Sequence, residues 1–131
     1  MQMSRSIGYA MLAVGYIAKN QDQKIILSHD IAKEYDIPLE YLLKILQQLV
    51  RANILHSKRG PRGGFYLAMQ PKKISMLQII EAVDGPMINR LNLAEQSGNQ
   101  KFGVRAEQIY HKAIAQTKAV FKKAKLSDLL K

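Results

Sequence analysis

One segment constrains the fold of this chain most: two short apolar runs, residues 54–56 and 65–67, flank a glycine-rich turn. Gly60, Pro61 and Gly63 lie in the turn, and apolar runs joined by glycine and proline predict a β-hairpin. Cations crowded at a hairpin tip repel one another, so their placement there favours a polyanionic partner. Taken alone, the segment is explained equally well by a solvated surface turn. The turn carries three cations and no acid, namely Lys58, Arg59 and Arg62.

Three predicted helices precede this hairpin. Ser4 caps a first helix that extends to about residue 19, and a short strand is predicted over residues 24–27. Ser28 caps a second helix over residues 29–35, and Pro38 marks the start of a third helix over residues 39–52. A short helix, a tight turn and a longer helix form a helix-turn-helix, and the hairpin that follows completes the order of a winged helix.

The third predicted helix has two chemically different faces. Steps of about 100° per residue place an apolar set on one side. The opposite side is a polar stripe whose long side chains can hydrogen-bond base edges or phosphates, although a solvated helix face is the usual meaning of such a stripe. The apolar set is Leu42, Ile45, Leu46 and Leu49, and the polar stripe is Glu40, Lys44, Gln47 and Arg51.

The rest of the chain predicts a shorter helix and a long one. Ser75 caps a helix that ends before residues 84–86, and residues 87–103 are irregular, with a mobile loop at 96–100. A long helix over residues 104–124 then carries an apolar stripe that favours pairing with a second copy of the chain. Residues 125–130 form a small closing cap. The stripe is Ala106, Ile109, Tyr110, Ala113, Thr117, Val120 and Phe121.

The expected fold is therefore mainly α with a small β-hairpin. Residues 1–84 form a winged helix-turn-helix domain, residues 85–103 a connecting loop, and residues 104–131 a dimerisation helix with its cap. A length of 131 residues suits one domain with an appended element, and the net charge of +10 favours nucleic acid as the partner.

Little in the sequence suggests catalysis. The chain has no cysteine, which excludes disulfides and thiolate chemistry, and its three histidines, His29, His56 and His111, lack the spacing of a metal site. No nucleophile motif, phosphate-cradling loop or catalytic carboxylate pair occurs. We therefore expect a protein without enzymatic activity, cofactor or metal. The first residues lack a signal-peptide pattern and the apolar run 7–18 is too short to span a bilayer, so a cytoplasmic protein is expected.

At this point the sequence resembles the Rrf family of bacterial winged-helix transcription regulators, the family of IscR, NsrR and CymR. The likeness covers most of the chain and is most specific in residues 59–68, which read Arg-Gly-Pro-Arg-Gly-Gly-Phe-Tyr-Leu-Ala. Residues 8–11, 30–32, 41–46 and 81–85 also carry it. The resemblance implies a homodimer that binds a pseudo-palindromic operator in double-stranded DNA, with the long helices crossing at the interface.

Many members of the family hold an iron–sulfur cluster through three cysteines placed between the post-wing helix and the long helix. Here the corresponding residues 87–103 contain no cysteine, and Glu95 is their only strong ligand candidate. Because cluster iron is held mainly by thiolates, we expect no cluster of this kind. The regulatory signal would then be a small-molecule effector, a regulatory protein, or none.

The predicted DNA contacts divide by role. Glu40, Lys44 and Gln47 would probe the major groove, and the resemblance implies that Arg59 enters the minor groove, with Arg62 in or beside it. A second set would hold phosphates, which position the protein without conferring sequence choice. This phosphate set is Ser4, Arg5, Ser28, Arg51 and Lys58, and Leu39, Tyr41 and Gly60 complete the predicted surface.

Two other functions stay open from the sequence. The winged helix could be a protein-interaction module that docks a metabolic enzyme. Alternatively, the dispersed charge of +10 suits a non-specific nucleic-acid-binding protein. A protected dyad in a footprint would favour the regulator over both.

Overall fold

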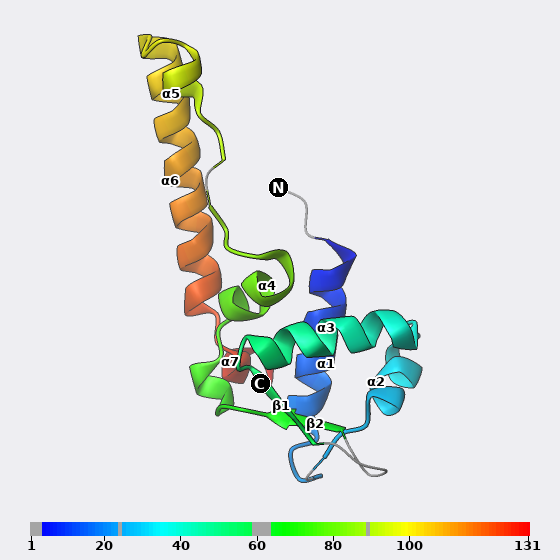
Figure 1. Cartoon of the computed structure of the whole chain (residues 1–131). Helices are drawn as coiled ribbons and strands as arrows, with labels where there is room; N and C mark the ends of the chain where they lie inside the picture. The colour runs from blue at the N-terminus through cyan, green and yellow to red at the C-terminus, as the bar shows by residue number, and fades with distance from the viewer. Residues whose placement is uncertain (1–3, 24, 59–63, 89) are drawn as a thin grey trace.

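The structure, a computed structural model, describes residues 4–23, 25–58, 64–88 and 90–131. It is mostly helical with one two-stranded antiparallel sheet, which confirms the predicted fold class (Figure 1). No described helix is both long and apolar enough to cross a lipid bilayer. In chain order the elements are α1 (Arg5–Lys19), α2 (Ser28–Tyr35), α3 (Leu39–Arg51), β1 (Leu55–Lys58), β2 (Gly64–Leu67), the 3-10 turn η1 (Pro71–Lys73), α4 (Met76–Asp84), α5 (Leu93–Gln96), α6 (Lys101–Lys123) and α7 (Leu126–Leu129).

The hydrophobic core lies where α1, α3 and α4 pack on one another, with the hairpin and α2 against its margins. α1 contributes a nearly continuous set of buried side chains, as its apolar girth predicts. α3 contributes the four residues of its predicted apolar face, all of which are buried. Other fully buried side chains in the cluster are Ile31, Ile54, Leu55, Ile74 and Ile79.

The hairpin forms as predicted, with Leu55 opposite Leu67 and Lys58 opposite Gly64. The predicted strand over residues 24–27 is wrong for its described part, since residues 25–27 make only a single bridge, between Ile26 and Phe65. The two backbones exchange N–H···O bonds of 2.9 and 2.8 Å there. α2 begins directly after Leu27, so the chain turns into a helix before a strand can extend.

Of the three predicted serine caps, those at Ser4 and Ser75 form and that at Ser28 does not. Ser75 caps α4 in a capping box, with its hydroxyl accepting from the Gln78 N–H at 3.1 Å and the Gln78 side chain accepting from the Ser75 N–H at 2.7 Å. The predicted Ser28 cap is wrong: Ser28 is the first residue of α2, and the Leu27 carbonyl receives the opening helical hydrogen bonds.

The long helix begins at Lys101, earlier than the predicted residue 104, and the interval before it is not wholly irregular. It holds α5, which packs on the start of α6. A tight turn with positive φ at Gly98 and Asn99 joins the two helices. A Cβ built on Gly103 would lie 2.6 Å from the Leu93 carbonyl oxygen, so glycine permits this close approach.

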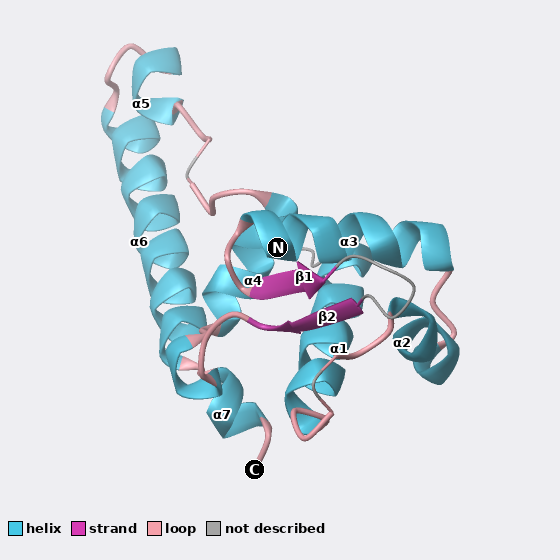
Figure 2. Cartoon of the chain, turned by 60° about the horizontal axis from the view of Figure 1, so that its bottom comes forward, coloured by secondary structure: helices cyan, strands magenta, loops and turns pink. Residues whose placement is uncertain are grey.

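α6 stands out from the winged-helix part of the chain as a long rod (Figure 1). Only its lower half packs on the domain, through α4, while its upper half carries α5. Its lower end is fixed by a bridge between Ser75 and Lys125, in which the Met76 N–H donates to the Ala124 carbonyl and the Leu126 N–H to the Ile74 carbonyl, both at 2.8 Å. α7 then closes the base beside η1 (Figure 2).

Candidate nucleic-acid interface

α3 presents a polar face to solvent. Its apolar positions are buried, whereas Glu40, Lys44, Gln47 and Arg51 are all exposed, as the helical pattern predicts. Leu39 is exposed as well. The exposed side chains therefore supply donors and acceptors along a helix of 13 residues, a length that fits in the major groove of DNA.

One exposed residue of this face was missed from the sequence. Leu43 lies between Leu39 and Gln47, four residues from each, and is 37% exposed. An apolar side chain on this face can contact a thymine methyl group. The sequence could have indicated its exposure, because Leu43 lies outside the set of residues predicted to be buried, which is Leu42, Ile45, Leu46 and Leu49.

Tyr41 fixes the start of α3 against α1. Its hydroxyl forms a hydrogen bond with the Ser6 hydroxyl, and its ring meets the Tyr9 ring edge-on at 5.6 Å between centroids. The ring is still 40% exposed. Tyr41 thus ties the start of α3 to α1 while keeping part of its surface toward solvent.

The amino terminus of α1 lies at the end of α4. The Ser4 hydroxyl accepts from the Ile7 N–H at 3.3 Å, which caps α1, and donates to Asp84 Oδ1 at 3.0 Å. Arg5 follows directly and is exposed. Ser4 therefore joins two helices, and the neighbouring guanidinium is available to a phosphate.

Ser28 is half-buried at the amino terminus of α2, where backbone N–H groups point outward. Within the described residues its hydroxyl makes no hydrogen bond. A hydroxyl together with free N–H groups at a helix start can bind a phosphate oxygen. The geometry keeps Ser28 in the predicted phosphate set although it does not cap α2.

The hairpin lies beside α3 and turns one face outward (Figure 2). His56 pairs across the strands with Tyr66, their rings 5.4 Å apart, and both are exposed. Lys58 is exposed two residues along the same strand. Strand alternation places His56, Lys58 and Tyr66 on one face, and this alternation could have added the His56–Tyr66 pair to the predicted surface.

The predicted residues Arg59, Gly60 and Arg62 lie outside the described part of the chain. The cations that are described on this surface, Arg5, Lys44, Arg51 and Lys58, have no acidic partner among the described residues. Their charge is therefore left to attract an anion.

Comparison with known proteins agrees with this geometry. The model of the Rrf2 family, described as iron-dependent transcriptional regulator, matches residues 3–131. The HTH-type transcriptional regulator IscR of Cereibacter sphaeroides is 27% identical over 137 residues, which cover all of this chain and 88% of that protein. The structure of CymR, titled the global cysteine regulator of B. subtilis, superposes with a TM-score of 0.81 at 22% identity, covering 99% of this chain and 96% of that one.

Two further relatives match about three fifths of this chain. A protein of Aquifex aeolicus with the provisional name of HTH-type transcriptional regulator is 40% identical over 81 residues, or 62% of this chain. BadM of Rhodopseudomonas palustris, named in the same provisional way, is 41% identical over 80 residues. The chain spans about half the length of these two relatives, 56% of the first and 51% of the second.

The family description raises the question of an iron site, and the donor set of this chain does not fit one. The sequence contains no cysteine. Within the described residues, no three His, Asp or Glu side chains gather closely enough to hold a metal ion. Glu95, the predicted strongest ligand candidate of the connecting segment, instead accepts a hydrogen bond from the Asn92 side chain at 2.6 Å.

Proposed function

Because the chain belongs to the Rrf2 family of transcriptional regulators, we propose that it is a dimeric, sequence-specific DNA-binding repressor. The observation that carries this proposal is the exposed polar face of α3 beside a cationic hairpin. The relatives are named as transcriptional regulators rather than enzymes. With DNA as the proposed partner, the bacterial cytoplasm is the proposed location.

In this proposal, α3 enters the major groove. Lys44 and Gln47 donate to base edges, and Glu40 accepts from cytosine amino groups. The wing lies over the adjacent minor groove, with Arg59 and Arg62 attracted by its negative potential. Phosphate contacts then fix the register of the protein on the duplex. They are assigned to Arg5, Ser28, Arg51 and Lys58, whereas the Ser4 hydroxyl, predicted as a further phosphate contact, already donates to Asp84 Oδ1.

The dimer is proposed to form through α6. Within this helix, whose residues are all described, only Gly103 is buried. Phe102, Ile109 and Val120 are 85%, 70% and 65% exposed. At about 100° per residue these three side chains and Ala113 fall on one narrow stripe. A second copy of the chain, related to the first by a twofold axis and packed on this stripe, would remove the exposed apolar side chains from water. The same axis would bring the recognition helices α3 of the two copies together as a pair.

The repressor is further proposed not to sense through an iron–sulfur cluster, because the chain lacks the thiolates that hold such a group. Its signal is then a small-molecule effector or a regulatory protein. A bound dimer acts as a repressor by occupying DNA that the transcription machinery needs. A reporter gene behind a bound fragment tests directly whether the bound protein lowers transcription.

DNA binding is tested by fluorescence anisotropy on a fragment selected from the source genome and on a shuffled copy. We expect the wild type to prefer the selected fragment and the Lys44→Ala/Gln47→Ala variant to lose about 1–3 kcal/mol of that preference per half-site. Lys112→Ala, which removes one charge from α6, is the control. Equal binding to both fragments would favour the non-specific binder, and a stoichiometric protein partner without DNA binding would favour the docking module.

A further inference from the structure

A groove opens on the side of the molecule where α4, η1 and the lower half of α6 meet. Its volume is about 820 Å³, within the range of small-molecule sites. It lies outside the predicted DNA-contact set and outside the connecting segment of residues 85–103. Its charged lining is Lys73, Glu81, Lys118, Lys122 and Lys125, and Ser75 and Gln78 are its other polar residues.

The groove is strongly cationic. Four lysines and one glutamate line it, which gives a formal charge of 4 − 1 = +3. In the part of the chain that the structure describes, none of these ammonium groups is paired with a carboxylate. Glu81 is already engaged, since its Oε2 accepts from the Met87 N–H at 2.7 Å. Converging like charges are unfavourable unless an anion joins them.

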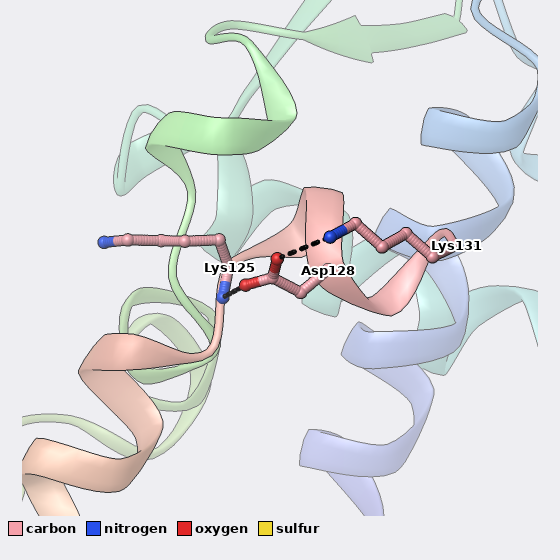
Figure 3. A network of polar contacts seen from close by, with 3 residues as sticks. All are labelled: Lys125, Asp128 and Lys131. Atoms are coloured by element: carbon pink, nitrogen blue, oxygen red, sulfur yellow. Dashed lines mark hydrogen bonds and ion pairs between the residues drawn. The ribbon is translucent and has the colours of Figure 1, made fainter.

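Two features leave hydrogen-bond donors of the groove lining without a partner among the described residues. The capping box holds Gln78 by its side-chain oxygen, which leaves its NH₂ group without a partner among the described residues. Figure 3 shows the second: Asp128 accepts from the Lys125 backbone N–H and pairs with Lys131 at 3.7 Å, while the Lys125 side chain extends in the opposite direction. The half-buried Lys125 is thereby left to the groove rather than to the neighbouring acid.

The groove spans the junction between the winged-helix part and the long helix. Lys73 and Gln78 belong to the first, and Lys118 and Lys122 to the second. Helical rotation at about 100° per residue places Ala115, Lys118 and Lys122 on nearly the opposite side of α6 from the stripe that contains Ile109 and Val120. A dimer formed through the stripe therefore leaves the groove open.

We propose that this groove binds a small metabolite with at least two anionic groups, carboxylates or phosphates, which bridge the lysines of α6 to those of η1 and the α7 cap. Such a ligand braces α4 against α6. Since α6 would set the separation of the two recognition helices, binding changes operator affinity, and the operator changes ligand affinity by the same factor. This regulatory step rests on the proposed function, whereas ligand binding itself does not.

The test is calorimetric titration of the full chain, without DNA, with inorganic pyrophosphate as a diphosphate and citrate as a tricarboxylate. We expect saturable binding of at least one probe with one site per chain. Lys118→Gln/Lys122→Gln should weaken it about tenfold. Lys112→Gln/Lys123→Gln removes the same charge from the same helix outside the groove and should change the affinity less than about twofold. Amide NMR shifts at Gln78 and Ala119, rather than at Lys58, locate the probe.

Three results would overturn the proposal. One is the absence of saturable binding of either probe. Another is an equal loss in both double variants, which would mean attraction to the net charge alone. The third is a Lys118→Gln/Lys122→Gln variant that keeps its affinity for the probe but loses affinity for DNA, which would make the groove a DNA contact. Probe binding by a chain that prefers no DNA sequence would instead reject the proposed function and leave the site standing.

Discussion

At the residue scale, Gly64 decides how closely the wing can approach the segment before α2. A Cβ built there would lie 2.4 Å from the Ile26 carbonyl oxygen, the atom that accepts the Phe65 N–H. The clash involves backbone, so it cannot be relieved by rotating a side chain. The glycine-rich turn predicted the hairpin, but this contact depends on a bridge to a residue far away in the chain.

Gly64→Ala is expected to destabilise the protein by about 1–3 kcal/mol, the cost of forcing an extra methyl into a packed site. Urea unfolding of wild type and variant measures it. Gly15→Ala is the control, because nothing lies within 4 Å of the added Cβ in the middle of α1 and the helix should gain about 0.5–1 kcal/mol. An unchanged midpoint for Gly64→Ala would contradict the close approach.

The two serines show what a local pattern can predict. Ser75 is followed three residues later by Gln78, the spacing of a capping box, and the box forms. Ser28 is followed at that spacing by Ile31, which cannot return a hydrogen bond and is fully buried. Ile31 is held in the hydrophobic core. This packing makes Ser28, rather than the predicted His29, the first residue of α2.

Ser75→Ala is expected to cost about 1 kcal/mol, because it leaves a helix donor unsatisfied at a site that is 3% exposed. Ser28→Ala should change the free energy of unfolding by less than about 0.5 kcal/mol, the range of surface substitutions. The two variants are compared by their urea midpoints. Equal effects would show that the assigned caps are wrong.

At the element scale, α3 was predictable almost completely, whereas two short segments elsewhere in the chain were not. Its apolar and polar positions recur with the period of a helix, so both faces follow from the sequence. The strand expected over residues 24–27 reduces to a bridge at Ile26, because one apolar run of four residues fits several structures. α5 was missed since a helix of four residues carries too little periodicity to detect.

Gln47 and Arg51, one turn apart on the exposed face of α3, should contribute differently to DNA binding. Arg51→Ala, at the assigned phosphate contact, is expected to weaken binding on every sequence and to flatten the salt slope by about one unit per half-site. Gln47→Ala should leave the slope unchanged and reduce the preference for the selected fragment. Anisotropy titrations across a range of salt concentrations separate the two. A preserved slope in Arg51→Ala would contradict the phosphate assignment.

At the scale of the whole molecule, α6 shows why the sequence predicted a partner but not its exact face. The apolar stripe read from the sequence combined two sets of residues. Thr117 and Phe121 are half-buried, whereas Ile109 and Val120 are exposed. The two sets differ in exposure because α4 and α5 pack against α6. This packing is a tertiary contact, which the periodicity of α6 alone does not reveal.

Ile109→Glu is expected to convert a dimer to a monomer. The charge would enter the proposed stripe twice, once from each copy, and should weaken association at least about a hundredfold. Sedimentation velocity over a range of concentrations measures the mass. Gln108→Glu adds the same charge beside the stripe and should stay dimeric. A monomeric wild type, or a dimeric Ile109→Glu, would contradict the interface.

Footprinting on a fragment selected from the source genome tests directly whether two copies of the chain present α3 and the wing to a specific DNA site. A bound dimer should protect two half-sites related by a dyad, with centres roughly 10 base pairs or a multiple of that apart. Protection should weaken at both half-sites together in Ile109→Glu. Uniform protection along the fragment at every protein concentration would contradict the account.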